Sequence, residues 1–140
     1  MTIPIKNSEE IEKMRLAGRL AAQLLDYIEP FIKPGVTTNE LNDLCHRYQL
    51  DIQGTIPAPL NYGQPPFPKS ICTSVNHVIC HGIPIDKPLK TGDIINIDVT
   101  VIKDGWHGDT SRMYFVGTPS VMARRLVEVT REAMWRGIHA

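Results

Sequence analysis

The most informative run of the sequence is Asp93-Ile-Ile-Asn-Ile-Asp-Val-Thr-Val-Ile102, which is followed by Lys103-Asp-Gly105 and then by a second strand-like run from Trp106 to Val116. The first run is rich in β-branched residues, which are typical of strands. An Asp-Gly pair between two such runs is the strongest short-range signal of a β-hairpin. The sequence therefore predicts a hairpin over about residues 93–116.

The turn sets the register of this hairpin. If Asp104-Gly105 forms a two-residue type I′ turn, Lys103 pairs with Trp106 and Asp98 lies opposite Ser111. Because side chains alternate across a strand, one face of the first strand then carries only apolar side chains. We expect this apolar wall to pack on helices; its members are Ile95, Ile97, Val99 and Val101.

Two acids, Asp98 and Asp109, share the opposite face in this register. They are diagonal neighbours with Cα atoms roughly 7–8 Å apart, so both carboxylates can reach one small object. A three-residue loop without a bulge would put them on opposite faces. Facing carboxylates repel unless a shared proton, a cation or a bound metal offsets the repulsion. Divalent metals suit such oxygen ligands, and the alternative is a wet face on which both acids are simply solvated.

The composition indicates an ordinary globular chain. Among 140 residues, 42% are hydrophobic and 21% are charged, so a core is feasible. The fifteen basic and fifteen acidic residues cancel without a basic block, which gives no support to direct nucleic-acid binding. No apolar stretch approaches the ~20 residues that span a bilayer, and the N-terminus lacks the apolar core of a signal peptide. Three cysteines without paired spacing favour reduced thiols and a cytoplasmic location.

The remaining elements are mostly helical. Apolar periodicity and capping patterns predict helices at about 8–29, 38–53 and 119–138. Thr37 with Glu40 is a capping box for the second helix, and Pro119 suits the first position of the third. One apolar stripe runs along the first helix through Ile11, Met14, Ala17, Ala21, Leu24 and Ile28.

Two loop regions carry chemical groups. From Ile56 to Pro68 the chain holds five prolines together with Tyr62 and Phe67, which predicts a stiff loop that either lines a pocket or covers a core edge. The stretch 69–83 predicts two strands around a turn at Asn76-His77, with His81 at the end of the second strand. There the imidazole is free to point into a cleft, although a lone histidine is more often structural.

Several separated motifs together resemble type I methionine aminopeptidases. They are Cys80-His-Gly-Ile-Pro84, Gly92-Asp-Ile-Ile-Asn-Ile-Asp-Val-Thr-Val-Ile102, His107-Gly-Asp-Thr-Ser111, Glu9-Glu-Ile-Glu-Lys-Met-Arg-Leu-Ala-Gly18 and Lys33-Pro-Gly35. The resemblance implies the α+β pita-bread fold, a curved antiparallel sheet with helices on its convex face, built from two pseudo-symmetric halves. It also implies a metal-dependent exopeptidase that removes the initiator methionine from nascent proteins. Residues 1–140 would then be a single incomplete domain, the N-terminal half of that fold.

The resemblance also implies roles for individual residues. Asp98 matches the terminal metal ligand and Asp109 the bridging ligand of two divalent ions, whether Co, Mn, Fe, Zn or Ni. His81 matches a catalytic, substrate-contacting histidine near the scissile amide. Further matches are Tyr62, Phe67 and Cys72, which would line the pocket for the methionine side chain, and Asn76 and Val78, whose backbone carbonyls would bind one monovalent cation.

The sequence departs from the family pattern in two places. Gln64-Pro-Pro66 looks like a short insertion before Phe67, and Pro59 stands where many bacterial members carry a pocket cysteine. The family also takes a histidine and two glutamate metal ligands, and a further substrate-facing histidine, from its C-terminal half. The chain ends before those positions. Alone it is therefore expected to be inactive, with the C-terminal half required as a partner.

Three functions remain open at this point. The first is removal of initiator methionine in the cytoplasm, with nascent peptide N-termini as substrate, a ribosome contact left open, and no membrane or direct nucleic-acid partner. The second is a non-catalytic module of the same fold that binds peptides or a partner. A self-complementing homodimer is the third, but two copies would supply four aspartates and none of the missing histidine and glutamate ligands. The presence of Asp98, Asp109 and His81 together favours the first, because a pure binding module has no physical need for paired acids.

Overall fold

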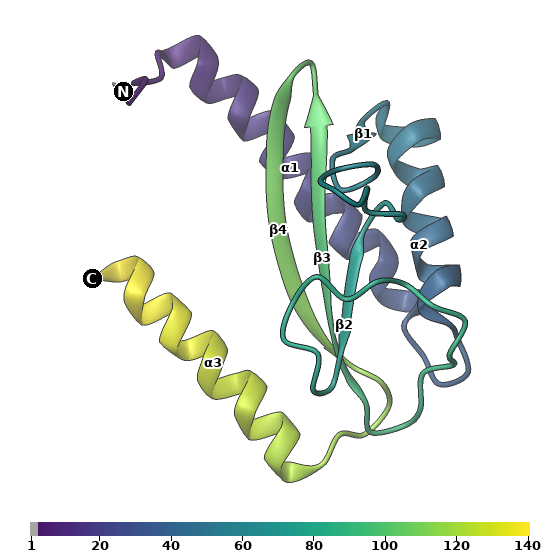
Figure 1. Cartoon of the computed structure of the whole chain (residues 1–140). Helices are drawn as coiled ribbons and strands as arrows, with labels where there is room; N and C mark the ends of the chain where they lie inside the picture. Colours follow the sequence, from purple (N-terminus) through teal and green to yellow (C-terminus); the bar gives the residue numbers. More distant parts are fainter. Residues whose placement is uncertain (1–2) are drawn as a thin grey trace.

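The computed structural model describes residues 3–140 (Figure 1). In chain order the elements are α1 (Ser8–Ile28), the 3₁₀ turn η1 (Glu29–Phe31), α2 (Thr38–Arg47), the π-helical turn η2 (Tyr48–Gln53), β1 (Ile56–Pro57), β2 (Cys72–Val75), β3 (Ile94–Lys103), β4 (Trp106–Phe115) and α3 (Val121–His139). The architecture is α+β, as predicted.

The sheet is antiparallel and centred on β3. Strand β4 pairs with β3 over ten residues, from Lys103 opposite Trp106 to Ile94 opposite Phe115. The short strands β1 and β2 pair with the other edge of β3. Asp104 and Gly105 both have positive φ, +50° and +83°, as a type I′ turn requires. The predicted register is confirmed, including Asp98 opposite Ser111.

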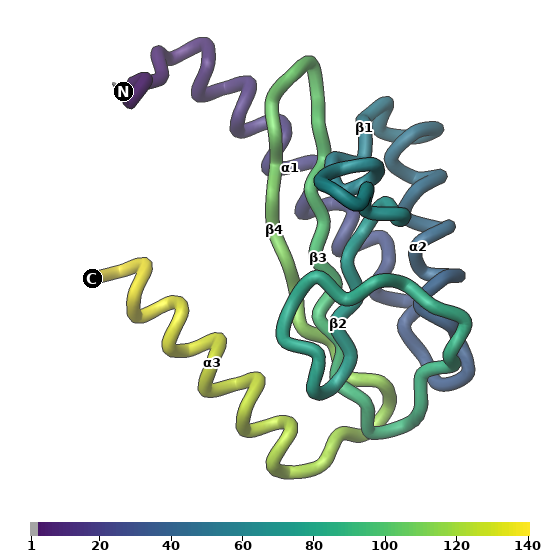
Figure 2. Tube along the Cα trace, in the orientation of Figure 1, coloured from purple at the N-terminus to yellow at the C-terminus, as the bar shows by residue number. Residues whose placement is uncertain are grey.

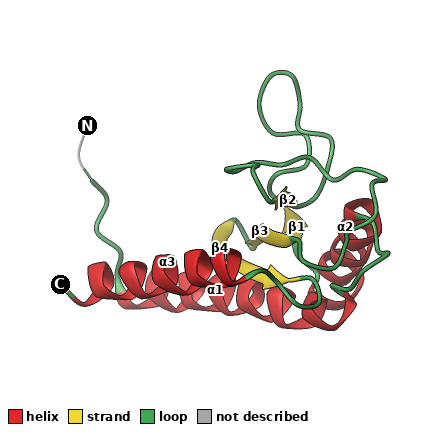
Figure 3. Cartoon of the chain, turned by 90° about the horizontal axis from the view of Figure 1, so that it is seen from below, coloured by secondary structure: helices red, strands yellow, loops and turns green. Residues whose placement is uncertain are grey.

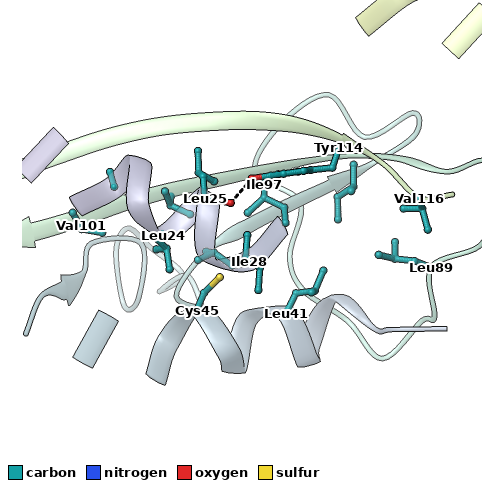
Figure 4. Packing of buried hydrophobic residues seen from close by; sticks show 14 residues of the cluster. Leu24, Leu25, Ile28, Leu41, Cys45, Leu89, Ile97, Val101, Tyr114 and Val116 are labelled. Carbon is teal, nitrogen blue, oxygen red and sulfur yellow. Dashed lines mark hydrogen bonds between the residues drawn. The ribbon is translucent and has the colours of Figure 1, made fainter. Parts of the chain in front are cut away.

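Helices and loops lie on opposite faces of the sheet (Figure 3). α1 packs against β3 and β4, and the residues of β3 that face it are fully buried: Ile95, Ile97, Val99 and Val101. They form one core with α1 and α2, drawn in Figure 4; its other members include Leu24, Leu25, Ile28, Leu41 and Cys45. The predicted apolar wall is confirmed, and it leaves the opposite face of the hairpin free.

Capping residues determine where the first two helices begin. The Asn7 side chain accepts from the backbone N–H of Glu10 at 3.0 Å, and the Glu10 carboxylate accepts from the N–H of Asn7 at 2.8 Å. Thr37 and Glu40 form the same reciprocal pair at α2, as predicted. The predicted apolar stripe of α1 is wrong at Ile11 and Met14, because both side chains are 43% exposed instead of buried. The first turns of α1 extend beyond the sheet, so nothing covers them there (Figure 2).

Two expected elements differ in the structure. Only Cys72–Val75 forms a strand in the stretch 69–83, and His81 has a φ of +53°, which no strand residue adopts. The return segment nonetheless lies beside β2, because the N–H of Thr73 donates to the carbonyl of Gly82 at 2.7 Å. The expected turn at Asn76-His77 is present.

The third helix begins later than expected. Its N-cap is Ser120, whose Oγ accepts from the N–H of Ala123 at 3.1 Å, so Pro119 precedes the helix rather than opening it. Serine is a strong N-cap because its side chain satisfies an otherwise free N–H. No residue of α3 is buried, and the helix stands away from the sheet in Figure 1. Among residues 3–140, no helix is long and apolar enough to cross a membrane.

Candidate metal and peptide site

A pocket of about 660 Å³ opens beside the polar face of the hairpin. All six residues whose side chains the sequence singled out line it: Tyr62, Phe67, Cys72, His81, Asp98 and Asp109. They come from four separate segments, the β1–β2 loop, β2, the return segment after it, and the β3–β4 hairpin. The fold therefore gathers these groups at one place.

The hairpin register brings the two acids together. Asp98 pairs with Ser111 and Asp109 pairs with Thr100, so the acids lie diagonally on one face. Asn96 continues that face and donates from Nδ2 to the Ser111 hydroxyl at 3.3 Å. Placing both carboxylates on the pocket side depends on the two-residue turn, because one extra residue would turn Asp109 to the core.

Asp98 sits in an environment that disfavours its charge. Its pKa is raised, first by burial and then by the negative charge of Asp109, while His81 acts in the opposite direction. A nearby cation would relieve both the desolvation and the repulsion. A bound positive ion would therefore stabilise this pair of carboxylates.

Cys72 gives the pocket an uncharged sulfur next to the acids. It pairs directly with Asp98 across the β2–β3 ladder and is 8% exposed. Burial, followed by the charge of Asp98, raises the pKa of its thiol to about 11. The thiol is therefore neutral at physiological pH and behaves as a small apolar group.

The β1–β2 loop forms the apolar wall of the pocket. The N–H of Asn61 donates to the carbonyl of Phe67 at 2.8 Å, and the N–H of Phe67 donates to the carbonyl of Tyr62 at 2.8 Å. Tyr62 is 78% exposed and lies at the rim, whereas Phe67 is partly buried. Of the two possibilities open for this loop, the structure supports pocket lining.

His81 reaches the pocket because the chain turns sharply beside β2. The next residue, Gly82, lies so close to β2 that an added Cβ would be 2.1 Å from the carbonyl oxygen of Thr73. Only glycine fits there. The close approach of the Gly82 backbone to β2, rather than the end of a strand, therefore positions the imidazole of His81.

Asn76 and Val78 line a separate hollow of about 420 Å³ that also touches Asp98. The Asn76 amide accepts from the N–H of Ile94 at 3.1 Å and donates to Asp93 at 2.9 Å. This side chain thus ties the turn to β3. Cation binding by the carbonyls of Asn76 and Val78 stays a prediction.

The pocket also includes Thr100, Ile102 and His107. The hairpin register predicted from the sequence puts Thr100 and His107 on the face of Asp98 and Asp109, whereas Ile102 was missed, although period-two spacing continues that face to it. Within residues 3–140 there is no group of three or more His, Cys, Asp or Glu residues that could hold a metal ion. Oxygen donors suit a divalent cation, so Asp98 and Asp109 fit one, but as two ligands of an incomplete set.

Comparison with known proteins agrees with this arrangement. Residues 12–140 match the model of metallopeptidase family M24, and the chain belongs to that family. Within the family, its similarity is to methionine aminopeptidases. It is 62% identical over 138 residues to the one from Rickettsia prowazekii and 56% identical over 136 residues to the one from Escherichia coli, covering 99% and 96% of this chain.

The structural match is equally close. The crystal structure of the Rickettsia prowazekii enzyme superimposes with a TM-score of 0.94 at 60% identity, over 98% of this chain and 54% of that one. The chain spans about half the length of these curated relatives, 52% and 51%. The fold matches half of the pita-bread structure of methionine aminopeptidases.

Proposed function

We propose that this chain is the N-terminal half of a methionine aminopeptidase domain and acts in the removal of the initiator methionine from nascent proteins in the cytoplasm. The observation that carries the proposal is the pocket in which two acids, a histidine and an apolar wall meet. M24 enzymes are metallopeptidases by family. The complete site would need further ligands from a C-terminal part, whether continuous with this chain or separate.

Each group of the pocket has a distinct task in this proposal. Asp98 and Asp109 would hold divalent ions, whose charge offsets the repulsion between the two carboxylates. When bound, such ions lower the pKa of a water molecule and polarise a carbonyl group. His81 would steady the scissile amide by hydrogen bonding, since imidazole both donates and accepts.

The apolar side of the pocket suits a methionine side chain. Phe67 supplies an aromatic ring and Cys72 a neutral thiol, and both favour contact with a thioether. Because the thiol is next to Asp98 in the β2–β3 ladder, a methionine bound there would have its peptide bond near the acids. The free amino end and the scissile bond would then lie on the same side of the pocket.

The test is reconstitution of activity. The 140-residue chain is mixed with the separately produced C-terminal half of the Rickettsia prowazekii enzyme, and methionine release from Met-Ala-Ser is measured with Co²⁺ or Mn²⁺. We expect release from the mixture, and none from the 140-residue chain by itself. Asp109→Asn should lower the restored rate at least 100-fold, about 2.7 kcal/mol, because a metal ligand is lost.

The matched control is Asp104→Asn. Asp104 lies at the tip of the same hairpin with positive φ, a conformation that asparagine also tolerates. This variant should keep the restored rate. Full activity of Asp109→Asn, or robust turnover by the 140-residue chain without its complement, would show that the proposed division of the site is wrong. Peptide binding without turnover in the mixture would instead favour a non-catalytic module.

A further inference from the structure

The β1–β2 loop carries a feature that the proposed function does not use. Its base is tied to the sheet, where the N–H of Ala58 donates to the carbonyl of Thr100 at 2.9 Å. From there the loop stands out from the face opposite α1 (Figure 3). Its tip, residues 63–65, also lines the pocket. The loop is therefore a wall whose base is near the acids and whose tip is at the pocket mouth.

Gln64 is the hydrogen-bonding residue of this tip. It lies between Gly63 and Pro65, which both line the pocket, and its side chain is exposed. A glutamine amide offers one carbonyl acceptor and two N–H donors. A peptide backbone presents the same two kinds of group in alternation, so one amide can pair with a peptide residue in both directions.

The loop is stiff at this point. Pro65, Pro66 and Pro68 each restrict φ to a narrow range. The hydrogen bonds between Asn61, Tyr62 and Phe67 close the loop below the tip. A pre-ordered wall loses little conformational entropy when a ligand binds, which makes even a single new hydrogen bond count toward affinity.

The direction of the bound peptide follows from the placement of the groups. The partly buried Phe67 and the buried Cys72 lie at the base, and Cys72 adjoins Asp98. With methionine seated there, the residues after the scissile bond have to leave through the mouth, past the exposed tip. We propose that Gln64 is a specificity-determining residue whose amide hydrogen-bonds the substrate backbone at the second or third residue. This inference rests on the proposed function.

The experiment compares two substrates in the reconstituted mixture. Methionine p-nitroanilide has no peptide residue beyond the scissile bond, whereas Met-Ala-Ser-Lys has three. Gln64→Ala should lower kcat/KM for the tetrapeptide about three- to tenfold, mainly through KM, as expected for one lost hydrogen bond. The anilide should be cleaved as before. The matched control, Gln23→Ala, removes an exposed glutamine from α1 and should change neither substrate.

Two kinetic outcomes would overturn the assignment of Gln64. An equal loss on both substrates would place Gln64 in the methionine subsite, and no loss on either would remove it from substrate binding. If the mixture shows no turnover at all, the proposed function is wrong. A binding measurement then tests the role of Gln64 separately. Titration of the isotope-labelled 140-residue chain with Met-Ala-Ser-Lys and with methioninamide, followed by NMR, should show the tetrapeptide alone weakened in Gln64→Ala. Equal affinities, or no binding of either ligand, would refute the role of Gln64.

Discussion

The two faces of β3 differ sharply in burial. Ile95, Ile97, Val99 and Val101 are fully buried against α1, while Asn96, Asp98 and Thr100 alternate with them and remain partly exposed. Neighbouring residues of one strand thus have opposite surroundings, because successive side chains point to opposite sides of a sheet. Residues that serve stability and residues that serve chemistry are thus separated here by one position in a strand rather than by domains. Substitutions on the two faces should therefore have different consequences.

The strongest contrast is between Val99→Asp and Asp98→Asn. The first puts a carboxylate into the core without a partner, which costs more than about 4 kcal/mol and should leave the chain unfolded. The second removes a charge whose raised pKa shows that it is disfavoured, so the folded state should persist with equal or slightly higher stability. Circular dichroism during thermal unfolding measures both. Comparable losses in the two variants would contradict the separation of the faces.

A smaller effect is expected at Gly108, which pairs with Val101 and thus lies on the buried face of β4. A Cβ at this position would be 2.1 Å from the carbonyl oxygen of Ala17, so α1 packs directly on the glycine. Gly108→Ala should force the helix away and lower the free energy of unfolding by about 1–3 kcal/mol.

The matched control for that variant is Gly18→Ala in α1. An added Cβ there has nothing within 4 Å, and alanine is a better helix former than glycine. This substitution should raise the free energy of unfolding by about 0.5–1 kcal/mol. Urea unfolding measures both changes. Equal stability of Gly108→Ala and the unmodified chain would mean that α1 does not approach β4 so closely.

The smallest effect concerns pH. Tyr114 faces the core, and its hydroxyl donates to the carbonyl of Leu25 at 2.8 Å. Burial raises its pKa to about 12 from an ordinary value near 10. Between these values the unfolded chain loses the phenolic proton and the folded chain keeps it, so stability falls as pH rises from about 10 to 12.

Tyr114→Phe should make this decline shallower, after a loss of about 1 kcal/mol at neutral pH from the missing hydrogen bond. The measurement is the urea midpoint at pH values from 7 to 11. Cys45, whose pKa burial raises to about 12, contributes in both proteins and cancels in the comparison. Tyr62→Phe is the control for the loss at neutral pH, since Tyr62 is 78% exposed and its side chain lies outside the core. If the urea midpoint fell equally steeply with pH in Tyr114→Phe, Tyr114 would not be the group that causes the decline.

Local patterns predicted much of the fold. The Asp104-Gly105 turn, the Thr37–Glu40 capping box and the alternation along β3 act over a few residues, and all are present in the structure. Predictions failed where a tertiary contact decided the outcome. The stretch around His81 is strand-like in sequence, but the close approach of Gly82 to Thr73 gives it another backbone path. The buried stripe of α1 begins only after Met14, because the sheet does not extend to the first turns of the helix.

From the sequence alone, a two-residue turn at Asp104-Gly105 predicts that Asp98 and Asp109 face the same side, and the structure confirms both that turn and the register that it sets. Only the tertiary structure decided that Phe67, Cys72 and His81 meet those acids in one pocket. The two differ because the interactions that set them act over different separations along the chain. Turn and strand geometry act between neighbours in the chain, whereas a pocket forms where the packing of distant segments leaves a space that no periodicity encodes.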